Sequence, residues 1–188
     1  MSTTALDVHP AREPDDASLI GRARLGDAGA ADALVRRYLG DVYAVTSRVL
    51  LDHDLAQDAA QEAFVNALRG LKRFRGEASF RTWLLRIALN AARTIARRQY
   101  HRREVSFEAV HDTPADTKDA AHMVALHDEA MRASALLERL PEKQRMAVSL
   151  RIHQGLSYQE IGVVLDCTEG AARVNYHLGI KRLRELLK

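Results

Sequence analysis

Apolar residues recur at intervals of three and four along most of the chain, a period typical of amphipathic α-helices. Alternation of apolar and polar residues between turn signals, which would indicate β-strands, is almost absent. In the first half the pattern predicts four helices separated by polar or glycine-containing breaks, over residues 17–25, 28–50, 54–72 and 80–99. The chain is therefore predicted to be all-α.

The second half predicts a helix-turn-helix. Pro141 suits the first turn of a helix over 141–153, and Gly155 suits the cap at its C-terminal end. The run Ser157–Glu160 is a capping box that opens a short helix. A three-residue turn then leads to a longer, basic helix from residue 169 to the end. The second helix of such a pair fits the major groove of B-DNA.

Charged residues are unevenly distributed, although the formal net charge of the 188 residues is only +3. Residues 81–103 contain seven arginines and no acidic residue, whereas residues 104–129 contain seven acidic residues and one lysine. Because the acidic stretch also holds Pro114 and few large apolar residues, we expect it to form a solvated, flexible linker. The expected division is a disordered leader over 1–16, a helical bundle over 17–103, a linker over 104–128 and a helix-turn-helix domain over 129–188.

Composition argues against several function classes. The single cysteine, Cys167, cannot form an internal disulfide, so the cytoplasm is the expected location. No apolar run reaches the ~20 residues that cross a bilayer, and the N-terminus lacks the features of a signal peptide, so we expect no membrane insertion. The eight histidines are scattered and no catalytic constellation is visible. We therefore expect no metal, no cofactor and no enzymatic activity.

The arginine-rich helix over 80–99 has two contrasting faces. The face expected to be buried carries Leu84, Ile87, Ala88, Ala91 and Ile95. The opposite side carries three arginines with an aromatic residue and an amide at its edge, namely Arg86, Arg93, Arg97, Trp83 and Asn90. Guanidinium groups hold phosphates, a ring stacks on a base and an amide bonds base edges, so this side predicts binding to single-stranded nucleic acid. The alternative is a solvated basic face with Trp83 packed in the core, which for Trp83 alone is the commoner outcome.

The helix over 54–72 carries an acidic stripe. The residues expected to face inward are Ala60, Phe64, Leu68 and Leu71. The outside is lined by Asp58, Glu62, Val65 and Arg69, with Gln61 beside them. Two carboxylates four residues apart could be solvated, could dock a protein or could act as acid and base. No cleft or third catalytic group accompanies them, so catalysis is not expected, and the first two interpretations stay open.

The last helix separates in the same way into an apolar and a basic face. Its inner face carries Ala172, Tyr176, Ile180, Leu183 and Leu187. Its outer face carries Arg173, Val174, His177, Leu178, Lys181 and Arg184. Arginine and lysine on the outer face could contact phosphates or guanine edges. The alternative is a solvated helix in an ordinary bundle.

Three motifs, taken in order, resemble the bacterial sigma factors of the extracytoplasmic-function (ECF) group. They are Gln57–Phe64, Phe74–Asn90, and Leu140–Arg145 followed by Gly155–Ile161. The resemblance covers nearly the whole chain from Ser18 to Leu187. It implies a transcription initiation factor that binds core RNA polymerase and promoter DNA, contacts the β′ clamp helices and the β flap of the polymerase, and is held by an anti-sigma factor.

The resemblance also implies roles for individual residues. The positions that grip the β′ clamp helices are Asp58, Gln61 and Glu62. Those around the pocket for a flipped minus-ten base are Phe74, Ile87 and Asn90, although Phe74 could equally pack inward. Those facing the minus-thirty-five groove are Arg173, Val174, His177 and Leu178, and the helix pattern adds Lys181.

The chain departs from the family at three of its positions. The family often has a small polar residue where Val174 stands and a basic one where Leu178 stands, so these two residues could meet thymine methyl groups instead. An acidic residue that the family often shows near Thr94 is absent, which leaves the role of Arg97 and Arg98 open.

A second function remains possible from the residues alone. A stand-alone helix-turn-helix regulator would bind a palindromic site tightly as a dimer, without polymerase. The N-terminal arginine stripe and the long linker favour the initiation factor. A nucleic-acid-processing enzyme is disfavoured because the sequence shows no metal or nucleophile constellation.

Overall fold

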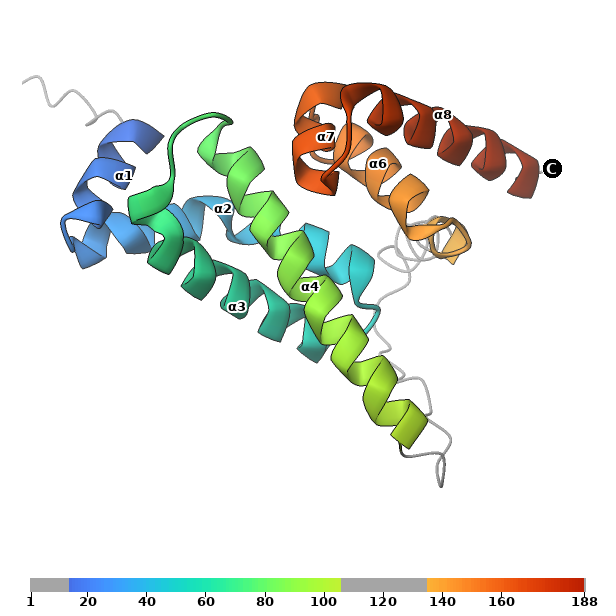
Figure 1. The fold of residues 1–188 in the computed structure, drawn as a ribbon, viewed down its shortest axis with the longest axis horizontal. Helices are drawn as coiled ribbons and strands as arrows, with labels where there is room; N and C mark the ends of the chain where they lie inside the picture. Colours follow the sequence, from blue (N-terminus) through green and yellow to red (C-terminus); the bar gives the residue numbers. More distant parts are fainter. Residues whose placement is uncertain (1–13, 106–134, 188) are drawn as a thin grey trace, which may run out of the picture.

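The computed structural model describes residues 14–105 and 135–187, and every element of regular structure within those ranges is a helix (Figure 1). The first domain contains α1 (Asp16–Arg24), α2 (Ala28–Val49), α3 (His53–Gly70), the short 3₁₀ helix η1 (Leu71–Arg73) and α4 (Phe80–Val105). The second contains α6 (Glu142–Ile152), α7 (Tyr158–Leu165) and α8 (Glu169–Leu186). The predicted all-α class with two helical domains is confirmed. The predicted leader and linker lie outside the described residues except at their ends, where residue 16 begins α1 and residues 104–105 continue α4.

Polar residues fix where the helices begin. The side chains of Asp15, Asp27 and Asp52 each accept a hydrogen bond from the backbone N–H three residues on, at 2.8–3.0 Å. Ser157 caps α7 in the same way, and Glu160 completes the capping box by accepting from the Ser157 N–H at 2.8 Å. These bonds satisfy N–H groups that have no partner within the helix, so the breaks fall where the sequence predicts them.

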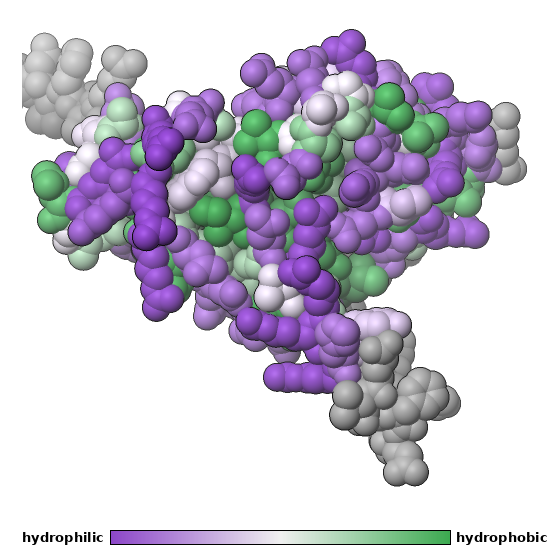
Figure 2. Space-filling model, viewed as in Figure 1, coloured by the Kyte–Doolittle hydropathy of each residue, from purple (hydrophilic) through white to green (hydrophobic). Residues whose placement is uncertain are grey.

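α4 is six residues longer than predicted, because it ends at Val105 and not at residue 99. Neither glycine nor proline occurs between these positions to stop it. Its C-terminal end projects beyond the other helices, with hydrophilic side chains around it (Figures 1 and 2). α3 ends earlier than predicted, since the chain tightens after Gly70 into η1.

α4 is also buried on more than one side. It packs against α2 and α3 of its own domain and against α7 of the second domain. Three of the predicted apolar residues are buried, namely Leu84, Ala88 and Ala91. Outside the predicted stripe, three more are fully buried, namely Leu85, Leu89 and Ala92, while Ile87 and Ile95 are only half-buried. The single-stripe prediction is wrong at these positions because α4 has partners in both domains, and one apolar cluster runs through the two.

Two leucines predicted to face inward are exposed. Leu68 is 37% exposed, because α3 buries a row of alanines, with Ala63 and Ala67 at its centre, and this small-residue face allows α4 to pack closely. Leu187 is 71% exposed and lies just past the end of α8. The rest of the predicted inner face of α8 packs as expected, with Ile180 against the cluster around Leu137.

Glycine allows the close approach of helices within the helix-turn-helix domain. A Cβ at Gly162 would lie 2.8 Å from the backbone oxygen of Cys167, inside the turn between α7 and α8. A Cβ at Gly179 would lie 2.7 Å from Cγ2 of Val148 on α6. The turn itself is closed by Asp166, whose φ of 57° is left-handed. The orientation of α8 therefore depends on these small residues.

We expect Gly162→Ala to lower the free energy of unfolding by about 1–3 kcal/mol, the usual cost of overpacking, because its methyl group would meet rigid backbone. The measurement is the urea midpoint of the full chain. Gly170→Ala is the matched control, since a Cβ there has its nearest neighbour at 4.0 Å and should be neutral or stabilising. Equal midpoints for the two variants would contradict the packing described above.

Candidate nucleic-acid and polymerase interfaces

The loop before α4 forms one wall of a hollow. Arg24 holds the loop by donating to the backbone oxygens of Leu71, at 3.0 Å, and of Phe74. The ring of Phe74 lies 5.0 Å from that of Trp83, and both lie 5.7 Å from that of Phe80. Phe74 and Trp83 thus pack inward and also form part of the wall of the hollow.

The hollow has a volume of about 590 Å³ and is lined by Arg73, Phe74, Arg75, Gly76, Glu77, Ala78, Trp83, Arg86 and Val163. It combines aromatic surface with guanidinium groups, the two chemistries that hold an unstacked base and its phosphates. Sequence reasoning missed Arg73 and Arg75 as lining residues. The signal available was a pair of arginines flanking Phe74 in a glycine-containing loop.

Two of the arginines predicted to bind the minus-ten DNA form ion pairs with the second domain. Arg86 Nη2 lies 2.7 Å from Oδ1 of Asp166, in the helix-turn-helix turn. Arg93 Nε lies 2.7 Å from Oε1 of Glu142, in the first turn of α6. Acidic side chains of the second domain therefore occupy part of the predicted arginine face, and its contact with DNA stays a prediction.

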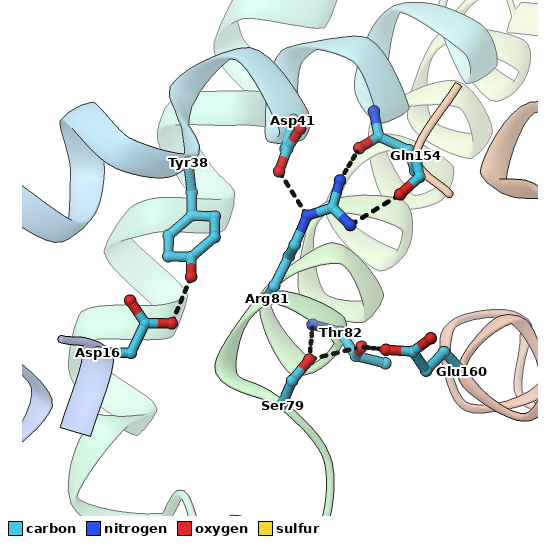
Figure 3. Close-up of polar contacts among 8 residues, drawn as sticks. All are labelled: Asp16, Tyr38, Asp41, Ser79, Arg81, Thr82, Gln154 and Glu160. Carbon is cyan, nitrogen blue, oxygen red and sulfur yellow. Dashed lines mark hydrogen bonds and ion pairs between the residues drawn. The ribbon is translucent and has the colours of Figure 1, made fainter. Parts of the chain in front are cut away.

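Arg81, which the sequence reasoning did not single out, links the two domains (Figure 3). Its Nε donates to Asp41 of α2 at 2.6 Å, while its Nη1 and Nη2 donate to the backbone and side-chain oxygens of Gln154 at 2.8 and 2.5 Å. The hydrogen bond with Asp41 raises the pKa of Arg81 above its ordinary value. The guanidinium therefore stays charged and serves as a fixed structural link.

A second polar contact across the domains involves Thr82, which is fully buried (Figure 3). Its hydroxyl donates to Glu160 Oε1 at 3.2 Å and also bonds with Ser79 at 2.8 Å. Hydrogen bonds from Ser157 lower the pKa of the Glu160 carboxyl, with a smaller contribution from Thr82. The capping box of α7 therefore also anchors α7 to the start of α4.

The remaining residues predicted to bind the minus-ten DNA lie further along α4. Asn90 and Arg97 are exposed, whereas Ile87 is half-buried and packs against the core. A second hollow, of about 370 Å³, lies where the projecting part of α4 meets α6, and is lined by Arg93, Ala96, Arg97, Tyr100, His101 and Glu142. A basic surface therefore continues from the loop pocket toward the free end of α4.

The acidic stripe of α3 lies at the surface, although not all of it is fully exposed. Asp58 and Gln61 are exposed and Glu62 is half-buried. Val65 and Leu68 extend this face with apolar surface. Exposed apolar side chains rimmed by polar groups are one feature of protein-docking surfaces, and docking through this face stays a prediction beside the solvated interpretation.

On α8 all six residues predicted to face outward are exposed, namely Arg173, Val174, His177, Leu178, Lys181 and Arg184. Arg173 is paired with Glu169 at 2.9 Å and lies 5.2 Å from the centre of the Tyr158 ring. The position of this face is confirmed, while its contact with DNA stays a prediction.

Within residues 14–105 and 135–187, no group of histidine, cysteine and acidic side chains is arranged to hold a metal ion. In the same ranges, no helix is long and apolar enough to span a bilayer.

Comparison with known proteins decides the family. Residues 34–102 match the family described as Sigma-70 region 2, and residues 130–183 match Sigma-70, region 4. The chain is 37% identical to the RNA polymerase sigma-H factor of Pseudomonas aeruginosa, over 86% of this chain and 88% of the relative. It is 36% identical to the ECF RNA polymerase sigma-E factor of Escherichia coli, over 84% of this chain and 86% of the relative. The chain belongs to the ECF sigma factors.

Solved structures agree with this assignment. CnrH, determined in complex with the cytosolic domain of CnrY, superposes with a TM-score of 0.68 and 26% identity, over 92% of this sigma factor and 96% of CnrH. The sigma factor RpoE of Bartonella quintana, determined with the anti-sigma factor NepR, has the same fold, with a TM-score of 0.67 and 22% identity over 83% of this chain and 95% of RpoE. The protein is thus a transcription initiation factor. RNA synthesis itself is carried out by the polymerase and not by the sigma factor.

Proposed function

We propose that this sigma factor docks on core RNA polymerase through the acidic face of α3. In this assembly Asp58, Gln61 and Glu62 contact the β′ clamp helices, and the second domain contacts the β flap. The outer face of α8 binds the major groove of the minus-thirty-five element, through Arg173, Val174, His177, Leu178 and Lys181. The factor works in the cytoplasm, where the polymerase and the chromosome are.

The observation that carries this proposal is the pocket beside α4. Phe74 and Trp83 offer ring surface to a base that leaves the minus-ten stack, and Arg86 offers a cation to its phosphate. Ile87, Asn90, Arg93 and Arg97 continue the same surface along the strand. Stacking contributes ~1–3 kcal/mol per base, which is the scale needed to offset unstacking. Capture of unpaired bases then shifts the duplex toward the open state.

The proposed function requires the two domains to separate. Arg86 and Arg93 cannot hold promoter phosphates while Asp166 and Glu142 occupy them. Val163 of α7 also forms part of the pocket wall. In this proposal the free factor keeps these interdomain contacts, and binding to polymerase and promoter exchanges them for contacts with DNA.

A protein inhibitor is also proposed. CnrH, which shares the fold over nearly its whole length, was solved with a second polypeptide, the cytosolic domain of CnrY. By analogy an anti-sigma factor holds the present factor until its signal arrives. A pull-down from cells, scored for the β′ subunit and for a small inhibitory protein, tests both partners, and recovery of neither would contradict this part of the proposal.

The direct test is transcription from a promoter library by core polymerase with and without the factor. Promoter-specific transcripts that need both components support the proposal. A gel shift separates it from the stand-alone regulator, which would bind duplex DNA tightly without core enzyme. Tight binding of that kind, with no factor-dependent transcript, would overturn the proposal.

We expect Asp166→Asn combined with Glu142→Gln to strengthen binding of the free factor to a single-stranded minus-ten oligonucleotide by about 3- to 10-fold, the scale of two partly exposed ion pairs. Asparagine tolerates the left-handed backbone of residue 166, so the turn should survive. Trp83 is the only tryptophan in the chain, so quenching of its fluorescence measures the binding.

The matched control is Asp32→Asn with Glu138→Gln, which changes the net charge equally at exposed positions away from the domain interface. If the control variant gains as much affinity as the interface variant, general electrostatics explains the effect and the domains do not compete with DNA.

A further inference from the structure

The outer face of α8 carries two apolar side chains that the fold does not use. Val174 is 58% exposed and Leu178 is 45% exposed, one helical turn apart on the same stripe. The opposite face of α8, with Ala172 and Gly179 buried, already supplies the packing against the rest of the domain. Folding therefore gives no reason for branched apolar residues at these two positions.

The polar side chains nearby are engaged in contacts within the domain. Arg173 is paired with Glu169 and lies over the Tyr158 ring. The amide of Asn175 donates to the backbone oxygen of Ala171 at 2.8 Å, within its own helix. His177 lies against the ring of Tyr176, with centroids 5.3 Å apart. The middle of the exposed face thus carries Val174 and Leu178, with the exposed imidazole of His177 beside them.

The charged side chains around this apolar pair indicate which kind of molecule binds there. Exposed basic side chains surround it, namely Arg173, Lys181, Arg182 and Arg184. Such a rim complements a phosphate backbone on both sides of a groove. In the major groove of B-DNA the apolar group that distinguishes one base from the others is the C5 methyl of thymine. Duplex DNA containing thymine therefore matches both features, because its phosphates pair with the basic side chains and its methyl groups contact the apolar pair.

We propose that Val174 and Leu178 read the methyl groups of two thymines in the minus-thirty-five element. Four residues of α-helix rise by about 6 Å, so the two thymines lie within about two base-pair steps of each other. They can be on the same strand or on opposite strands. This inference rests on the proposed placement of α8 in the groove and adds the class of base that it selects.

The experiment replaces thymine by deoxyuridine at each position of the minus-thirty-five element of a promoter that the holoenzyme uses. This exchange removes one methyl group and leaves all hydrogen-bonding groups and base pairs unchanged. For wild-type holoenzyme we expect affinity for the promoter to fall about fourfold at each of two positions, the effect of losing one buried methyl contact. At other positions the exchange should have no effect.

Two variants assign the contacts. Val174→Ala should lose sensitivity to deoxyuridine at one of the two positions and keep it at the other, and Leu178→Ala should show the reverse. The control is Lys181→Ala, which should weaken binding equally to thymine and deoxyuridine templates, since phosphate contacts do not distinguish bases.

Failure of this inference is distinguishable from failure of the proposed function. Transcription from the all-thymine promoter tests the proposed function in the same reaction, and its absence refutes that function. Normal transcription with no loss at any deoxyuridine position refutes only the thymine contacts. Deoxyuridine effects that persist unchanged in both alanine variants also refute them. Unaltered affinity for either template in both variants would exclude duplex DNA as the occupant of the apolar pair, and would likewise overturn the inference.

Discussion

Replacing Asp58 and Glu62 together by lysine is expected to weaken binding to core polymerase about a hundredfold and to abolish promoter-specific transcription, since like charges facing each other across an interface cost several kcal/mol. Both residues lie on one face of α3, and neither has a role in the helix core. The change should therefore leave the fold intact. The measurement is titration of labelled factor with core enzyme, with thermal unfolding of both proteins alongside.

The matched control for this variant is Asp32→Lys with Glu138→Lys, which reverses two exposed carboxylates on other helices. It should bind core enzyme nearly as well as wild type. If both double variants bind equally well, α3 is not the docking surface, whatever their effect on transcription.

Neutralising Arg86 and Arg93 together, as Arg86→Gln with Arg93→Gln, is expected to reduce promoter opening by the assembled holoenzyme about a hundredfold. Each arginine is proposed to form a charge-assisted hydrogen bond with a phosphate in the open complex, and such bonds contribute about 1.5–3 kcal/mol each. Core binding and minus-thirty-five binding should change little, because both involve other helices. Permanganate reactivity of thymines at the minus-ten element measures the opening.

Both substitutions also break ion pairs between the domains. The control therefore has to distinguish the loss of these ion pairs from the loss of the phosphate contacts. Asp166→Asn with Glu142→Gln breaks the same two pairs from the other side and keeps the arginines. That variant should open promoters at least as well as wild type. Normal opening by the arginine variant would remove the main argument for strand capture on α4.

Much of this arrangement is predictable from local sequence. The periodicity of apolar residues predicts seven of the described helices. The positions where two of these helices begin are also predictable, because the capping hydrogen bonds of Asp52 and Ser157 join residues only three apart in the sequence. The outward faces of α3 and α8 also follow from the helical period alone. Residue patterns on one helix are sufficient for these features, since no partner from elsewhere in the chain is needed to specify them.

The contacts between the domains are not predictable in this way. Arg86 and Asp166 are 80 residues apart, and Arg81 and Gln154 are 73 apart. Composition shows an arginine-rich helix but does not show which acidic residues meet it. The burial of Leu85 and Leu89 is not predictable for the same reason, because a single apolar stripe implies that the helix packs on one side only. In the sequence Arg81 is one member of a basic run, and only its three-dimensional neighbours give it a separate role.

The occupied arginine face has a consequence for how the factor competes for DNA inside a cell. A chromosome offers about 10⁶–10⁹ non-specific sites, and exposed cationic helices adhere to them regardless of sequence. A factor whose Arg86 and Arg93 are paired with its own carboxylates offers two fewer cations to such sites, so its idle copies adhere less through α4. Fewer copies are then held on the chromosome away from the polymerase.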